Sequence, residues 1–128
     1  MNFDEISSNG AADRALQLHA QQLWAAEAAK CAIDLSGFQA DAPVHERIAW
    51  AQSNGLTIAT VYARFSTKNQ GSIDDQVRAC VERAARMGLY CPPELISADA
   101  ALSGRKKRRD GLARTTWILE QRLATVVL

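Results

Sequence analysis

Apolar residues recur at helical spacing in the first part of the chain. Residues 11–33 are rich in Ala, Leu, Gln and Glu, which are good helix formers. One face of this helix collects the apolar residues Leu16, Ala20, Leu23, Trp24, Ala28 and Cys31. The spacing therefore predicts an amphipathic helix that buries one side.

A second helix is predicted through Ile48. Asp41 has the character of an N-cap, Pro43 falls near the first turn, and Asn54-Gly55 ends the helix. Together the two helices predict a helical hairpin as an N-terminal extension over residues 1–55. No catalytic chemistry is visible in it, and we expect His19 and His45 to be surface or packing residues.

The pattern changes at Leu56, where β-branched and aromatic residues predict a strand over 56–64. After a polar loop, Ser72 and Asp75 have the spacing of a capping box at the start of a helix that Gly88 ends. The apolar face of this helix collects Ile73, Val77, Cys80, Val81, Ala84 and Gly88. Ion pairs at i,i+4 are expected on the other face, from Asp74 to Arg78 and from Glu82 to Arg86.

The rest of the chain continues the alternation of strands and helices. A rigid Cys91-Pro92-Pro93 connector leads to a short strand over 94–98, a polar and basic loop over 99–110, a helix from Gly111 to about Leu123, and a strand over 125–128. Leu112, Thr116, Leu119 and Leu123 are aligned on that last helix. This order predicts an α/β fold with a parallel sheet and flanking helices, incomplete at the end of the chain.

Length and composition limit the class of protein. The chain has 128 residues, of which 48% are hydrophobic and 23% charged, which suits one domain or one small domain with an appendage. No apolar run approaches the ~20 residues of a membrane span. Cys31, Cys80 and Cys91 form no metal-binding pair, and their odd number without an export signal favours reduced thiols in a cytoplasmic protein. We therefore expect neither a membrane nor a metal partner.

The net charge of +1 hides an asymmetry between the two parts of the chain. Residues 1–55 hold seven acidic and three basic residues, a net charge of −4, and residues 56–128 hold seven acidic and twelve basic residues, a net charge of +5. A basic unit favours a polyanion such as nucleic acid, although a solvated surface is the simpler interpretation of charge alone.

Two polar clusters follow the predicted strands. The first comprises Tyr62, Arg64, Ser66 and Gln70, and the second comprises Asp99, Ser103 and Arg109. Ligands of open parallel sheets bind beyond the carboxyl ends of the strands, so both clusters are expected at one edge. The helix that begins at Ser72 points its N-terminus, which favours phosphate, to the same edge.

The chemistry of these clusters points away from acyl transfer. No histidine base or GxSxG motif accompanies Ser66, and no GxxxxGK[ST] motif is present. Serine among arginines suits phosphodiester chemistry, since guanidinium groups bind phosphate bidentately and stay charged. On spacing alone, the alternative is that Ser66 is a loop residue and Arg64 a surface charge.

The motifs VYARFSTKNQGSIDDQVRAC (61–80), DAALSG (99–104) and RRDGL (108–112) resemble the catalytic domain of serine site-specific recombinases. This family comprises resolvases, invertases and large phage integrases, and the large recombinase branch is the most similar. The resemblance covers roughly residues 56–114 and implies a truncated resolvase-like catalytic domain over 56–128. It implies double-stranded DNA as substrate, dimers that pair into tetramers, no cofactor, and a prokaryotic or phage-encoded protein of a mobile element.

The resemblance also implies roles for individual residues. Ser66 matches the nucleophile that forms a 5′-phosphoserine link and frees a 3′-hydroxyl, and Arg64 and Arg109 match phosphate ligands. The remaining matches are Tyr62 and Gln70, which shape the site, and Gln76, Asp99 and Ser103, which support it. Backbone contacts to DNA are expected from Lys68, Arg105, Lys106, Lys107 and Arg108, for which a solvated loop is the alternative.

Departures from the family pattern leave several functions open. Fifty-five residues precede the first strand, and the chain stops before the Leu-Asp-Arg-Leu-x-Arg segment, dimerisation helix and DNA-binding region of the family. Because arginines that stabilise charge would be missing, we expect little or no recombination activity, and we expect the exposed sheet edges to favour self-association. The alternatives are an inactive fragment that binds DNA or a full-length recombinase, and a remnant with no present role.

Overall fold

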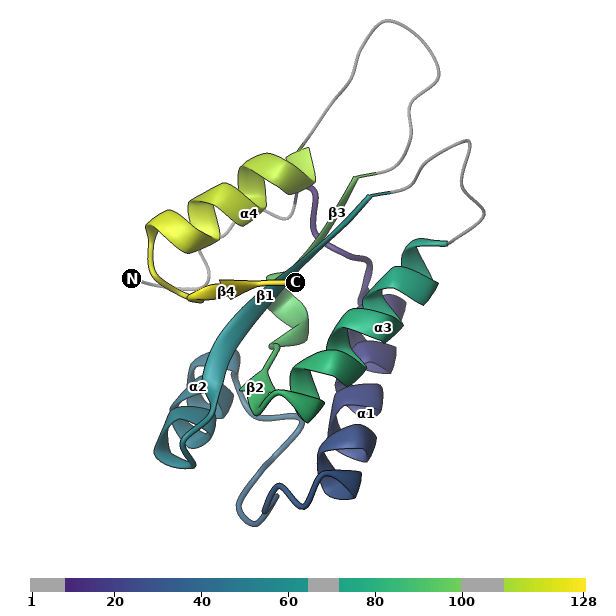
Figure 1. Cartoon of the computed structure of the whole chain (residues 1–128). Coiled ribbons are helices and arrows are strands. Elements are labelled where there is room, and N and C mark those ends of the chain that lie inside the picture. Colours follow the sequence, from purple (N-terminus) through teal and green to yellow (C-terminus); the bar gives the residue numbers. More distant parts are fainter. Residues whose placement is uncertain (1–8, 65–71, 100–109) are drawn as a thin grey trace, which may run out of the picture.

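The computed structural model of the chain describes residues 9–64, 72–99 and 110–128 (Figure 1). The elements follow in the order α1 (Arg14–Lys30), α2 (Val44–Ser53), β1 (Thr57–Arg64), α3 (Ile73–Arg86), β2 (Leu89–Tyr90), the short 3-10 helix η2 (Pro93–Leu95), β3 (Ile96–Asp99), α4 (Asp110–Glu120) and β4 (Val126–Val127). Within the described ranges, no helix is long and apolar enough to cross a membrane.

The sheet is parallel and is built around β1. β2 pairs with the start of β1, β3 pairs with its end, and β4 pairs with its middle, all in the parallel sense. α1 and α3 lie on one side of this sheet, and α4 lies on the other (Figure 1). Helices on both sides explain why residues 58–61 are all buried rather than alternating between buried and exposed. The predicted α/β fold with a parallel sheet and flanking helices is therefore confirmed.

The N-terminal segment adds a short antiparallel partner to β3. Ala11 forms a β-bridge with Ser97, the Ala98 amide donates to the Gly10 carbonyl at 2.7 Å, and the Ala12 amide donates to the Ile96 carbonyl at 3.0 Å. Gly10 has a φ of +84°, and a Cβ there would lie 2.4 Å from the carbonyl carbon of Asp110. The segment before α1 thus pairs with the sheet and touches the start of α4.

The two N-terminal helices pack against the sheet domain rather than mainly against each other. α1 packs along α3, and α2 packs on β1 (Figure 1). Their own contact runs through the rings of Trp24 and Trp50, whose centroids lie 6.4 Å apart. One hydrophobic core includes residues on both sides of position 55, and the domain boundary predicted there stays a prediction.

Trp24 is the centre of the contact between the N-terminal extension and the sheet domain. Its side chain is fully buried, its Nε1–H donates to the Leu89 carbonyl at 2.8 Å, and its ring meets Tyr90 edge-on at 4.7 Å between centroids. Phe38 packs on the same ring at 5.7 Å. A tryptophan of the extension therefore contacts the backbone and side chains of β2 directly.

Several local predictions about the first two helices need correction. Cys31 lies beyond the end of α1 and is exposed rather than on the buried face. Asp41 does not cap α2: Pro43 is the N-cap residue, and its carbonyl accepts the first helical bonds from Glu46 and Arg47. The predicted end at Asn54-Gly55 is confirmed, with Gly55 at a φ of +77°. His19 and His45 are exposed, as expected of surface residues.

The capping of α3 is confirmed, but its expected ion pairs are not. The Asp75 amide donates to the Ser72 hydroxyl at 3.0 Å, and Gly88 follows the helix with a φ of +73°. Arg78 pairs with Glu82 at 3.3 Å instead of with Asp74. Arg86 reaches across to Glu27 of α1 at 4.0 Å instead of pairing with Glu82. The neighbouring helix supplies a partner that spacing within α3 could not reveal.

The buried face of α4 also differs from the expected one. Its buried residues are Gly111, Arg114, Thr115 and Ile118, while Leu112 is 39% exposed. The Thr115 hydroxyl donates to the Gly111 carbonyl at 2.8 Å, so it is satisfied within the helix. The helix ends at Glu120, earlier than the predicted Leu123. The short strand expected over 94–98 instead comprises residues 96–99, because Pro93–Leu95 form the 3-10 helix.

Polar side chains of the extension and of the sheet domain are buried together where the two meet. The Arg47 guanidinium donates to the Ala42 carbonyl, to the Tyr90 hydroxyl at 2.8 Å and to Glu94, and the Tyr90 hydroxyl donates to Gln21 at 3.1 Å. Burial lowers the pKa of Arg47, but its bonds to Glu94 and Tyr90 outweigh this and raise it. The Arg47 guanidinium therefore stays charged. The network around it connects α1, α2, β2 and η2.

The stability of the protein should fall between about pH 10 and 12 because of Tyr90. Burial raises the pKa of Tyr90 from its ordinary value of 10.0 to about 12. A raised pKa in the folded state stabilises the fold fully below the unfolded pKa, and this contribution is lost as the pH rises through the folded pKa. The loss amounts to about 2 kcal/mol, measurable by urea unfolding at pH 9 and pH 11.5. Tyr90→Phe should remove that part of the slope, and an unchanged slope would contradict the assignment to Tyr90.

Candidate active site at the carboxyl ends of β1 and β3

The carboxyl ends of β1 and β3 lie side by side. The register pairs Arg64 with Asp99 and Tyr62 with Ser97. Figure 1 shows both strands ending at the same edge, where the segments 65–71 and 100–109 begin. The structure thus brings together the described members of the two clusters that the sequence places after these strands.

Asp99 connects the end of β3 to both β1 and α4. It is 7% exposed, and its Oδ2 accepts the Tyr62 hydroxyl at 2.6 Å. Its Oδ1 accepts the Gly111 amide at 2.7 Å, and its Oδ2 accepts the Leu112 amide at 3.1 Å. A helix leaves its first amides without intrahelical partners, so the carboxylate serves as a cap for α4. Asp99 therefore fixes the position of Tyr62 and the start of α4 relative to the sheet.

Gly111 allows α4 to approach β3 this closely. A Cβ at this position would lie 2.7 Å from the Ala98 carbonyl oxygen and 3.0 Å from Asp99 Oδ1. Any larger residue would push the helix away from the carboxylate that caps it. The Arg-x-Gly-Leu motif seen in the sequence thus contains a glycine that the packing requires.

Gln76 holds the end of β1. Its Nε2 donates to the Arg64 carbonyl at 2.7 Å, and its Oε1 accepts the Arg64 amide at 3.1 Å. The side-chain amide therefore makes the hydrogen bonds of a neighbouring strand on the side of Arg64 where no other described strand pairs with it. The Arg64 side chain itself is exposed at the edge, on a backbone that is held from one side by Gln76 and from the other by β3.

Replacing Gln76 with alanine should loosen the last residue of β1 without unfolding the protein. Two hydrogen bonds of the Arg64 backbone would be lost, at a cost of about 1–2 kcal/mol. Amide hydrogen exchange at Arg64 should accelerate, while exchange at Val61 in the centre of β1 should change only by the global destabilisation. Arg78→Ala, on the exposed side of the same helix, is the control. Equal acceleration of hydrogen exchange at the Arg64 amide in the two variants would contradict the proposed role of Gln76.

Nothing in the sequence singles out Arg114, a residue of α4 whose side chain holds β3 in place. Its guanidinium donates to Ser97 Oγ at 2.9 Å and to the carbonyl oxygens of Ile96 and Glu94 at 3.3 and 2.5 Å. Burial lowers its pKa. Because these contacts point it into the protein, Arg114 positions β3 and α4 rather than facing a ligand at the edge. The spacing of α4 residues gave no signal for this role.

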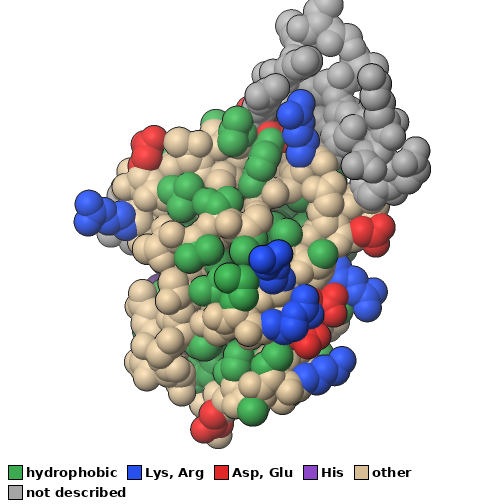
Figure 2. All heavy atoms as spheres, viewed as in Figure 1, with side chains coloured by type: hydrophobic (Ala, Val, Ile, Leu, Met, Phe, Trp, Pro, Cys, Tyr) green, Lys and Arg blue, Asp and Glu red, His purple; other side chains and the backbone are tan. Residues whose placement is uncertain are grey.

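Electrostatics at the start of α3 differ from the expected phosphate site. The Ser72 hydroxyl caps the helix, and Asp74 and Asp75 both lie exposed in its first turn. Two carboxylates there oppose the attraction that the helix N-terminus would exert on an anion. Figure 2 shows basic and acidic side chains interspersed over the face formed by α3, without a continuous basic stripe in the visible part.

The other predicted site residues lie outside the described residues. These are Ser66, Lys68, Gln70, Ser103, Arg105, Lys106, Lys107, Arg108 and Arg109. In the described ranges, no group of three His, Cys, Asp or Glu side chains has an arrangement that could hold a metal ion. The described part of the edge thus supplies a tyrosine, an exposed arginine and a capping aspartate.

Residues 59–128, more than half of the chain, match a family described as "Resolvase, N terminal domain". No curated protein and no solved structure matches the chain. The match begins within β1 and runs to the last residue, so it includes both strands of the edge and the helix that Asp99 caps.

Proposed function

Because the chain belongs to the resolvase N-terminal-domain family of serine site-specific recombinases, we propose that its sheet domain is a recombinase catalytic domain that cleaves and rejoins DNA through Ser66, with little activity in this chain by itself. The observation that carries this proposal is the register of β1 with β3. It places Arg64 beside Asp99, so that the segment with Ser66 and the segment with Ser103 and Arg109 both leave the sheet at one edge. The exposed Arg64 at this edge, with a serine and a second arginine on the segments that follow β1 and β3, suits a DNA phosphate.

In the proposed reaction, the Ser66 hydroxyl oxygen attacks a phosphorus atom of the DNA backbone. The bond from phosphorus to the 3′ oxygen breaks, that oxygen leaves as a 3′-hydroxyl with the proton lost by serine, and the 5′-phosphate stays on Ser66. Attack by a 3′-hydroxyl on the phosphoserine reverses these changes and rejoins the strand. One phosphoester replaces another at each step, so the chemistry needs no nucleotide cofactor.

The described residues support this reaction by holding the edge in shape. Arg64 presents a charge that stabilises the extra negative charge of the pentacoordinate transition state. Arg109, outside the described residues, is proposed as the second phosphate ligand. Gln76 fixes the backbone that carries Arg64. Asp99 already accepts three hydrogen bonds from Tyr62 and the start of α4, so we assign it a positioning role instead of proton transfer.

Covalent trapping tests the role of Ser66 without knowledge of the target site. The full chain is incubated with a pool of random-sequence DNA duplexes and stopped in detergent, and DNA that stays bound to protein is recovered. After nuclease digestion, mass spectrometry should find a nucleotide on the peptide that contains Ser66, at low yield. Ser66→Ala should abolish this adduct, whereas Ser72→Ala should leave it. Adduct of equal yield from Ser66→Ala would refute the proposed nucleophile.

DNA binding without cleavage is the second candidate function. It is favoured by the net charge of +5 on residues 56–128, much of it in the run from Arg105 to Arg109. Binding to phosphates releases counterions, so retention on duplex DNA should fall steeply as salt rises. Neutralising that run should weaken retention for all sequences alike. Salt-sensitive retention with no adduct on Ser66 would favour this function over the recombinase.

Resolvase-family proteins act on DNA as oligomers, and we propose a dimer of this chain as its working state. Among the described residues β4 pairs with β1 alone, and Val127 on it is 45% exposed, which supports the proposal. Sedimentation over a concentration series should show self-association. A clean monomer at the highest concentration would contradict it.

A further inference from the structure

The side of α4 that faces away from the sheet has an unusual composition for a surface helix. Such a helix normally turns charged residues toward water. Here the outward residues are Leu112, Ala113, Thr116, Trp117 and Glu120, which together line one shallow pocket and include a single charge. Leu112 is 39% exposed, and the Thr116 hydroxyl already donates to the Leu112 carbonyl at 3.0 Å. Figure 2 shows hydrophobic side chains exposed over this helix. The composition is therefore typical of a helix that another segment covers on its outer side as well.

The chain that leads into α1 passes the first residue of α4. The Ala98 amide donates to the Gly10 carbonyl at 2.7 Å, so this segment runs antiparallel to β3, and Asn9 and Gly10 form a turn near the carboxyl end of that strand. A Cβ at Gly10 would lie 2.4 Å from the carbonyl carbon of Asp110 and from the nitrogen of Gly111. Figure 1 shows this purple part of the chain beside the start of α4. The chain therefore enters the described structure next to the first turn of α4.

Residues 1–8, which lie outside the described residues, have the length and the composition to cover this face. An extended chain of that length spans about 26 Å at ~3.3 Å per residue, whereas α4 has 11 residues and is about 16 Å long. The segment has the sequence MNFDEISS and supplies the apolar side chains of Met1, Phe3 and Ile6. Its acidic residues, Asp4 and Glu5, can stay in water while the apolar side chains pack.

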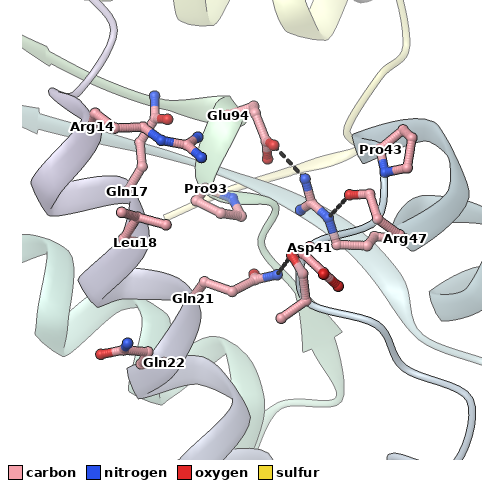
Figure 3. Close-up of a pocket in the computed structure, with 12 residues that line it drawn as sticks. Arg14, Gln17, Leu18, Gln21, Gln22, Asp41, Pro43, Arg47, Pro93 and Glu94 are labelled. Carbon is pink, nitrogen blue, oxygen red and sulfur yellow. Dashed lines mark hydrogen bonds and ion pairs between the residues drawn. The ribbon is translucent and has the colours of Figure 1, made fainter.

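A cavity of about 340 Å³ between α1, the loop before α2 and η2 suits this segment less well (Figure 3). The charged residues Arg14, Asp41, Arg47 and Glu94 all line it. Figure 3 shows that Arg47 pairs with Glu94 in its wall, and Arg14 and Asp41 are exposed. Covering such a wall with apolar side chains would cost the charged groups their water. The nearly uncharged face of α4 is therefore the more favourable surface for an apolar segment.

We propose that residues 1–8 fold back over α4 and pack Phe3 and Ile6 against Leu112 and Trp117. The hydrophobic effect drives this contact, because it removes apolar surface of both segments from water. The link through Asn9 keeps the segment at an effective concentration on the order of millimolar, so a contact too weak to form between separate molecules forms within one chain. A second copy of the chain has no such advantage at low concentration. The segment therefore closes this face of α4 to other partners while it stays in place.

NMR spectra of the full chain and of a chain that lacks residues 2–8 test this contact. Removing the segment should shift the amides of Leu112 and Thr116 and the indole N–H of Trp117. The amides of Leu18 and Met87, two exposed apolar residues away from α4, should stay unchanged and serve as controls. A synthetic peptide of residues 1–8, added to the truncated chain, should move the shifted resonances back toward their original positions and reach saturation.

Thiol labelling measures the same contact by accessibility. In a Cys31→Ser background, Ala113→Cys should react with a maleimide at least threefold faster once residues 2–8 are removed. Ala26→Cys, at an exposed alanine of α1, should react at the same rate in both chains. Phe3→Ser in the full chain should also accelerate labelling at position 113. Equal labelling rates at position 113 with and without the segment would overturn the proposal. So would shifts of the Leu112 amide that depend on protein concentration and persist without residues 2–8, which would assign this face to a second copy of the chain.

Discussion

Replacing Trp24 with alanine should lower the free energy of unfolding by about 3–5 kcal/mol, the range for a fully buried aromatic ring. The change leaves a cavity among Phe38, Trp50 and Tyr90 and deprives the Leu89 carbonyl of its donor. Because α1 meets β2 through this ring, the loss should destabilise the sheet domain as well as the extension. Urea unfolding followed by circular dichroism measures the change.

Two variants separate the contribution of the buried Trp24 ring from that of its hydrogen bond to Leu89. Trp50→Ala removes the same kind of side chain from a half-buried position and should cost less than half as much. Trp24→Phe retains an aromatic ring but loses the bond to Leu89, and should fall between them. If hydrogen exchange after Trp24→Ala accelerates in α1 while Ile58 and Leu89 keep their protection, the extension unfolds independently and the shared core is not cooperative.

Replacing Asp99 with alanine should cost about 2–4 kcal/mol and release the start of α4. Three donors lose their acceptor at once: the Tyr62 hydroxyl and the amides of Gly111 and Leu112. The first of these amides is buried, so water cannot fully replace the carboxylate. Faster amide exchange at Gly111 and Leu112, together with a lower urea midpoint, should report the loss.

Asp110→Ala is the matched control for Asp99. It removes a carboxylate from the first residue of the same helix, where the only general effect is on the helix dipole, about 0.5 kcal/mol. Tyr62→Phe removes one of the three hydrogen bonds of Asp99 and should cost about 1 kcal/mol. If Asp99→Ala is no more destabilising than Tyr62→Phe, the carboxylate does not serve as the cap of α4.

Elements with strong local signals agree with the sequence-based predictions. β1 and α3 have the predicted positions, because one combines β-branched residues in a row and the other has a serine cap and a closing glycine. The prediction of Asp41 as a cap is wrong, and Leu112, one of the residues aligned on the last helix, is 39% exposed. The helix α2 begins two residues after Asp41, where the Pro43 carbonyl accepts the first helical bonds. In α4 a residue from outside the helix takes part, since the Asp99 carboxylate accepts the Gly111 amide.

The candidate site also contains contacts that the sequence could predict and contacts that it could not. The two polar clusters could be assigned to one edge because parallel strands end on the same side, and the register of Arg64 with Asp99 agrees. The clamp of Gln76 on Arg64 and the brace of Arg114 on Ser97 could not be predicted as contacts. Each joins a helix to a strand, and the rotation of a helix about its axis depends on what packs beneath it.

By itself, the sequence determined the alternation of strands and helices, the parallel sheet and the shared edge at which β1 and β3 end. These follow from periodicity, capping and chain direction, which act over a few residues. Tertiary structure alone decided that the extension packs through Trp24 onto β2 and that Asp99 caps α4. It also decided that Gly10 lies against the start of α4. Such contacts join residues far apart in the chain, and only the packing of a shared core selects among the many partners that local patterns allow.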